Sequence, residues 1–236
     1  MNQITQIRKL SLWIFLIPLI SINFCLFISV NHNLFDNTIF YVDHIGRSGF
    51  SIPYLDGSLS ISRASRTYPQ FLIFKPSMFI TSILLCFFWI KNSSFVNSFG
   101  QEKHKNNNFM IYGVLSAVFL FLHSMMLGIN TDVQILKFLK RIFLLGFIIF
   151  EIMAQTILVY NFYKLKEKLT NFINLKVLKL KIILVLGLSL VALFSIPLLI
   201  KSGNVHFKHA LEWNYFIAVI FFYLLTRFFW KKNNSI

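Results

Sequence analysis

Six long apolar runs alternate with polar segments along the chain, at residues 10–30, 71–90, 109–129, 142–162, 182–200 and 212–230. Each is close to the roughly 20 residues that an α-helix needs to cross the hydrocarbon core of a bilayer. The first run exceeds the core of a signal peptide, and no small-x-small cleavage pattern follows it. The pattern therefore predicts an all-α membrane protein with six transmembrane helices and an ordered outer segment, residues 31–70, between the first and second.

Composition supports this class. Hydrophobic residues make up 56% of the chain and charged residues only 13%, whereas about a quarter of the residues of a soluble domain are charged. The net charge of +15 would also suit nucleic-acid binding, but the lysines gather at the ends of the apolar runs. Lys and Arg at these places set the orientation of membrane helices, so we expect no nucleic-acid partner. Cys25 and Cys86 both lie inside apolar runs, and no disulfide framework is predicted.

The distribution of basic residues predicts the orientation. Six spans place both termini on one side, together with the expected loops at residues 91–108 and 163–181. The second loop is the most basic segment, with Lys164, Lys166, Lys168, Lys176, Lys179 and Lys181. Lys137, Lys140 and Arg141 are exceptions, because they are expected on the opposite side of the membrane. Because cytoplasmic loops are enriched in Lys and Arg, we expect both termini in the cytoplasm, in a bacterial plasma membrane or in an ER, Golgi or lysosomal membrane.

The most polar-bearing part of the outer segment is organised around a turn. Asp56 and Gly57 form a strong turn signal, and the serines that follow alternate with apolar residues, which predicts a short extended piece at residues 58–62. Its neighbours would cost free energy if exposed; they are Ile52, Tyr54, Leu55, Leu59 and Ile61. We therefore expect residues 53–62 to fold back onto the helix ends and to line a cavity with His123 and Glu212.

Polar side chains of several types are expected near this outer surface: Asp43, His44, Arg47, Asp56, Ser58, Arg63, Arg66, His123, His206, His209 and Glu212. Arginine binds phosphate bidentately, whereas carboxylate, histidine and serine can supply acid–base and nucleophilic chemistry. The catalytic candidates are Asp56, Ser58, His123 and Glu212; the candidates for substrate binding are Tyr54, Ser60, Arg63 and Arg66. The alternative is ordinary interfacial polarity. The spacing of His206, His209 and Glu212 favours a histidine pair at a helix start over a metal site, and we expect no metal.

The order of parts, with one helix, a long outer segment and five more helices, is similar to that of the Frag/DRAM/Sfk family. This family includes the post-GPI-attachment remodelling proteins and the N-terminal domain of CWH-type proteins. The resemblance is carried by Pro53-Tyr54-Leu55, Ser58, Ser60, Ser62, Pro69 and Phe74, and by the pair Glu212-Trp213. It implies work on lipid or glycolipid headgroups at the extracytoplasmic leaflet, with membrane lipids and a lipid-anchored protein or glycolipid as partners.

Glu151 is an acidic residue near the middle of the fourth run, and Gln155 lies four residues later on the same helical face. A carboxylate at this depth is costly unless it is paired, protonated or faces water. We expect both side chains to face the bundle interior, either as a functional acid or as a structural hydrogen bond.

Three functions remain open from the sequence. The first is a lipid or GPI-anchor remodelling factor, the second is a non-enzymatic scaffold or regulator of the DRAM type, and the third is a small-solute transporter. No Walker loop, dinucleotide fingerprint, CxxC or HExxH pattern occurs in the sequence, so no common cofactor is expected.

Overall fold

The computed structural model describes residues 3–41, 51–99, 108–128, 134–200 and 203–231. This part of the chain contains six helices that are long and apolar enough to cross a membrane. They are α1 (Gln3–Val30), α4 (Gln70–Phe99), α5 (Asn108–Met126), α6 (Gln134–Lys164), α7 (Leu175–Ile200) and α8 (Val205–Phe229). Between α1 and α4 lie η1 (His32–Phe35), α2 (Pro53–Asp56) and α3 (Ile61–Ser65). The prediction of an all-α membrane protein with six transmembrane helices is confirmed, and residues 31–41 and 51–70 of the segment between the first two are among those described.

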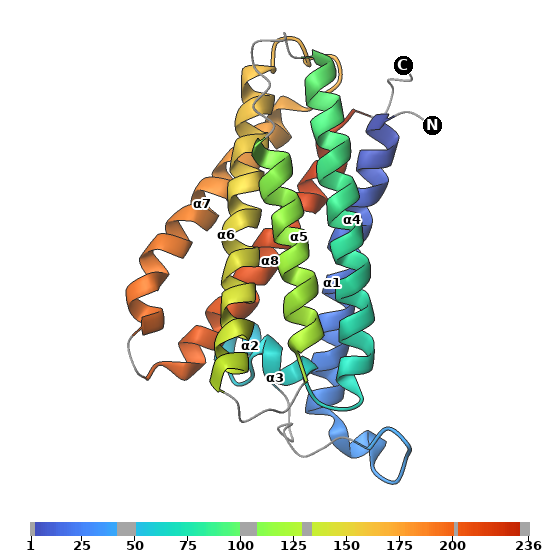
Figure 1. The fold of residues 1–236 in the computed structure, drawn as a ribbon, viewed down its shortest axis with the longest axis vertical. Helices are drawn as coiled ribbons and strands as arrows, with labels where there is room; N and C mark the ends of the chain where they lie inside the picture. The colour runs from blue at the N-terminus through green and yellow to red at the C-terminus, as the bar shows by residue number, and fades with distance from the viewer. Residues whose placement is uncertain (1–2, 42–50, 100–107, 129–133, 201–202, 232–236) are drawn as a thin grey trace.

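The six long helices form a closed ring. α1 contacts α4 and α8, α5 lies between α4 and α6, and α7 lies between α6 and α8. Both termini are at one end of the bundle, and α2 and α3 are at the other end (Figure 1). We call residues 51–69, which include α2 and α3, the end cap. The end cap therefore lies opposite the termini, as an even number of spans requires.

α4 and α7 extend well into segments that the sequence predicted as loops. α4 continues through Lys91 to Phe99, and α7 begins at Leu175 rather than at residue 182. Polar residues on these extensions face inward: Asn92 and Lys181 are fully buried, and the Asn92 amide donates to the Phe88 carbonyl over 2.8 Å. Hydropathy alone ends a helix at its first polar residues, so it missed these inward-facing turns.

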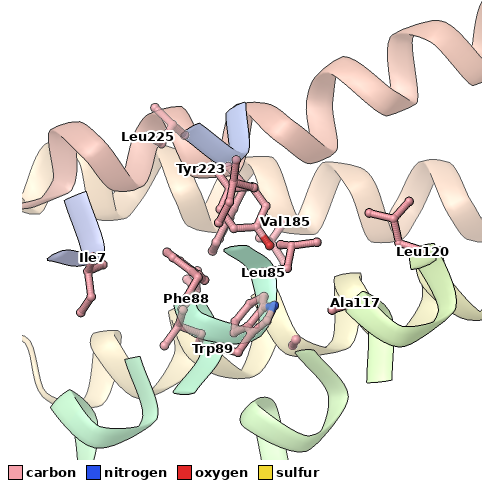
Figure 2. Close-up of a cluster of buried hydrophobic side chains, with 14 of the residues drawn as sticks. Ile7, Leu85, Phe88, Trp89, Ala117, Leu120, Val185, Tyr223 and Leu225 are labelled. Atoms are coloured by element: carbon pink, nitrogen blue, oxygen red, sulfur yellow. The ribbon is translucent and has the colours of Figure 1, made fainter. Parts of the chain in front are cut away.

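Aromatic side chains fill the interior of the ring. Phe88 and Trp89 of α4 face Tyr223 of α8, with ring centroids 5.0 Å and 6.5 Å from the Tyr223 ring (Figure 2). Both contacts are edge-to-face, the arrangement that the ring quadrupoles favour, and all three side chains are buried. α4 and α8 are therefore joined across the interior.

Gly113 of α5 permits the close packing of Trp89. A Cβ atom at position 113 would lie 2.2 Å from Cγ of the Trp89 ring, and the indole is fully buried. We expect Gly113→Ala to lower the Tm of the purified protein in detergent, with a destabilisation of about 1–3 kcal/mol from overpacking. Gly187→Ala in α7 is the matched control, because a Cβ there meets nothing within 4 Å. Equal melting temperatures for the two variants would contradict this packing argument.

Candidate functional site

The end cap begins with the turn that the sequence predicts. Pro53 opens α2, and Gly57 ends it in the left-handed conformation with φ 58°. The Asp56 carboxylate accepts hydrogen bonds from the backbone N–H groups of Ile52 at 3.0 Å and Ser58 at 2.7 Å. The side chain of Asp56 therefore stabilises the turn in which it lies.

Asp56 is exposed, and its environment favours the charged form. Desolvation acts in the opposite direction, but hydrogen bonds from Ser58, Ile52 and Ser51 prevail and lower the pKa of Asp56. The Ser58 hydroxyl also contacts the Ser51 hydroxyl. Two catalytic candidates, the exposed Asp56 and the partly buried Ser58, are thus neighbours on one turn.

Residues 61–65 are helical, whereas the sequence predicted an extended piece over residues 58–62. Ser60 is the N-cap of α3, and its hydroxyl accepts a hydrogen bond from the Arg63 N–H at 3.2 Å. The Glu212 carboxyl accepts hydrogen bonds from the N–H groups of Ile61 and Ser62, which have no partner inside the helix. The alternation of serines was misread because Ser60 acts as a helix cap.

Side chains of α8 bind the backbone of the end cap. The Trp213 indole donates to the Leu59 carbonyl at 2.8 Å, and the Asn214 amide donates to the Tyr54 carbonyl at 2.7 Å. The His209 Nδ1 atom lies 3.0 Å from the Gly57 carbonyl oxygen. These residues and Glu212 lie on the N-terminal turns of α8. They contact backbone groups of the end cap rather than its side chains.

α1 holds the other side of the end cap. The Tyr54 hydroxyl donates to the Asn23 side chain at 2.9 Å, and the Ser29 hydroxyl donates to the Ala64 carbonyl at 3.1 Å. The Tyr54 ring also packs edge-on against Trp213, with centroids 4.9 Å apart. Sequence reasoning missed Asn23 and Asn214, although a polar residue inside the first apolar run is the signal that points to Asn23.

Two basic candidates face away from the bundle. Arg63 and Arg66 are exposed on α3 and at its C-terminal end. Among the residues that the structure describes, neither guanidinium is paired with a carboxylate. Asp43, His44 and Arg47, also expected near this surface, lie outside the described residues.

The structure separates His123 from the end cap's hydrogen bonds. The His123 Nδ1 atom lies 3.1 Å from the Lys140 carbonyl oxygen, so this histidine joins α5 to α6, while Glu212 joins α8 to α3. Of the two residues expected beside residues 53–62, Glu212 contacts this segment, whereas the recorded hydrogen bond of His123 is to α6. His206 is exposed at the start of α8.

A second polar group lies at the centre of the bundle, and we call it the interior cluster: Ser116, Glu151, Gln155 and Tyr223. All four side chains are buried, with 0% exposure for Ser116, Glu151 and Gln155 and 1% for Tyr223. Glu151 Oε1 accepts from the Gln155 amide at 2.9 Å and from the Tyr223 hydroxyl. Glu151 Oε2 lies 2.6 Å from the Ser116 hydroxyl. The cluster therefore connects α5, α6 and α8 through one carboxyl group.

Lys181 is a buried cation that the sequence placed at the end of a surface loop. Its ammonium donates to the Thr226 hydroxyl at 2.8 Å and lies over the rings of Phe222 and Phe229, 3.9 Å and 5.2 Å from their centroids. The helical spacing of buried residues along α7 is the signal that could have found it: Val177, Leu178, Lys181, Val185 and Leu188.

Comparisons of the chain with protein-family models, with curated proteins and with solved structures found no match. A proposal for the function therefore rests on the geometry of the site and on the sequence pattern.

Proposed function

We propose that this multi-pass membrane protein binds and remodels lipid or glycolipid headgroups at its end cap, as its resemblance to the Frag/DRAM/Sfk family implies. The observation that supports this most directly is the way the end cap is attached. α8 binds it through the carbonyl groups of Tyr54, Gly57 and Leu59, so the side chains of Arg63 and Arg66 stay exposed at the end of the bundle.

Exposed arginines at this place suit the headgroup region of a bilayer. The planar guanidinium group binds phosphate through two parallel hydrogen bonds. Because the end cap is already held in place, the backbone that carries both arginines loses little further conformational entropy when a ligand binds. The turn with the exposed Asp56 and the partly buried Ser58 lies in the same end cap and supplies a carboxylate and a hydroxyl. A lipid-anchored protein or a glycolipid would present its phosphate and sugar groups at this depth.

Removal of both arginines tests the binding step. We expect Arg63→Gln/Arg66→Gln to lower photo-crosslinking of a phospholipid with a photoreactive headgroup to peptides from residues 51–70 by about thirtyfold, since each basic residue near an anionic surface contributes about 1 kcal/mol. The measurement uses the full chain in proteoliposomes and mass spectrometry of the adducts. The N–H of residue 63 still binds Ser60 in the variant, so α3 keeps its cap.

Lys176→Gln/Lys179→Gln is the matched control. It removes the same charge from exposed positions of α7, at the end of the bundle opposite the end cap (Figure 1), and adducts on residues 51–70 should stay at the wild-type level. Equal loss in both double variants would mean that overall charge, and not the end cap, attracts the lipid.

A non-enzymatic scaffold is the second candidate. The observation in its favour is that Tyr54, Ser60 and Glu212 all form hydrogen bonds that hold the end cap together. Lipid mass spectrometry of membranes with and without the protein separates the two. A changed acyl chain or headgroup supports remodelling, and an unchanged lipid profile supports the scaffold.

The same proposal requires the end cap to face away from the cytoplasm. We expect an impermeant thiol reagent to label Leu55→Cys in intact cells, because Leu55 is 80% exposed in the end cap. Glu167→Cys, exposed between α6 and α7, should be labelled only after permeabilisation. The wild type, with its buried Cys25 and partly buried Cys86, gives the background. Labelling in the reverse order would overturn the orientation.

A further inference from the structure

The Ser116 hydroxyl lies within hydrogen-bonding distance of two oxygen atoms but has only one hydrogen to donate. Its oxygen lies 2.8 Å from the Gly113 carbonyl oxygen and 2.6 Å from Glu151 Oε2. A hydroxyl carries one hydrogen and two acceptor sites, and a carbonyl oxygen can only accept. When the Ser116 hydrogen points to Gly113, the short contact with Glu151 is a hydrogen bond only if Glu151 Oε2 itself carries a hydrogen.

The other oxygen of Glu151 is arranged as the carbonyl oxygen of an acid. Oε1 accepts hydrogen bonds from Gln155 and Tyr223, and both are neutral donors. One oxygen that accepts twice and one that contacts a single hydroxyl fit the hydrogen-bonding pattern of a protonated carboxyl group. An ionised carboxylate could accept the Ser116 hydrogen, but the Gly113 carbonyl oxygen, 2.8 Å away, would then lose it.

Among the residues that the structure describes, no cationic side chain is recorded in contact with the Glu151 carboxyl group. α4 contributes the Trp89 indole, α5 contributes Ser116, and α8 contributes Tyr223. The buried lysine of α7, Lys181, donates to Thr226 and lies against two aromatic rings. Burial of an ionised carboxylate without a bonded cation is costly at this depth, whereas a neutral acid with three hydrogen-bonding partners is not.

We propose that Glu151 is a proton-binding site inside the bundle, with the proton on Oε2 donated to Ser116 and with Oε1 held by Gln155 and Tyr223. The site is distinct from the end cap, and the inference does not rest on the proposed function. Its ligand is a proton rather than a metal ion because the partners contact the carboxyl group directly, at 2.6 Å and 2.9 Å, as hydrogen-bonding groups do.

Infrared difference spectroscopy of the full chain in lipid nanodiscs at neutral pH tests the proposal. Wild type minus Glu151→Gln should show the C=O stretch of one protonated carboxylic acid and no loss in the carboxylate bands. The matched control is Glu167→Gln, which removes an exposed carboxylate and should reduce the carboxylate bands alone. If Glu151→Gln instead reduces the carboxylate bands, Glu151 is ionised and the proposal is overturned.

Tyr223→Phe keeps the carboxyl group and removes one donor to Oε1. It should leave the acid band present but move it to higher frequency, because the carbonyl oxygen has lost a hydrogen bond. This variant also covers the case in which Glu151→Gln fails to fold. Conversion of the acid band to carboxylate when sodium replaces choline in the buffer would show that the site takes a metal cation and would equally overturn the proposal.

Discussion

Substitution of Gly57 with alanine is expected to detach the end cap from α8. A Cβ atom at this position would lie 1.7 Å from the backbone oxygen of His206, so either the turn or the start of α8 has to move. The left-handed φ of 58° adds backbone strain for any residue with a side chain. We expect a local loss of about 2–3 kcal/mol, which amounts to roughly a hundredfold faster amide exchange in the end cap.

Hydrogen exchange with mass spectrometry on peptides from residues 51–69 measures this effect. Gly203→Ala is the matched control, because Gly203 has a φ of +97° but a Cβ there meets nothing within 4 Å. It carries the strain without the clash and should leave the exchange of the end cap unchanged. Slow exchange in both variants would show that the contact with His206 is not needed to hold the end cap.

The sequence was sufficient for the class and number of the spans because the bilayer imposes a length and a hydrophobicity on each one. The turn at Asp56 and Gly57 was also predictable, since a strong local signal sets it. Helix ends were not predictable in the same way. α7 begins before residue 182 because Lys181 turns inward to Thr226, and only the partner on α8 makes that lysine compatible with the interior.

The contacts of the end cap were also not predictable from local sequence signals. Its polar residues stood out in the sequence, yet several of them turn out to bind backbone groups or neighbouring helices. Glu212 reaches the first turn of α3, and Tyr54 reaches Asn23 of α1. These partners are far away in the chain, and no spacing rule links them. What the sequence did indicate is which side chains remain available, since Arg63 and Arg66 follow the turn and stay exposed.

The interior cluster could be predicted only from its own helix. Glu151 and Gln155 share a face by their spacing of four residues, but Ser116 and Tyr223 come from α5 and α8 and are ordinary residues in apolar runs. Ring closure brings them to one carboxyl group. This dependence on three helices is also why the choice of substitution at Glu151 should matter so strongly.

Glu151→Leu is expected to be among the most damaging single changes in the bundle, whereas Glu151→Gln should be tolerated. Leucine leaves Ser116, Gln155 and Tyr223 without the partner that they share. Interhelical hydrogen bonds in membranes contribute about 0.6 kcal/mol on average, and buried groups left unsatisfied cost about 1–3 kcal/mol each, so we expect a loss of roughly 2–4 kcal/mol.

Glutamine has the shape of a protonated glutamate and the same pattern of groups. Its amide nitrogen can donate to Ser116 while its oxygen accepts from Gln155 and Tyr223, so the Tm should stay close to that of the wild type. Thermal unfolding of both variants in one detergent measures the difference, with expression level as a check on folding. A glutamine variant as unstable as the leucine variant would mean that the cluster requires a charge at position 151, because the two substitutions share only the loss of the carboxylate.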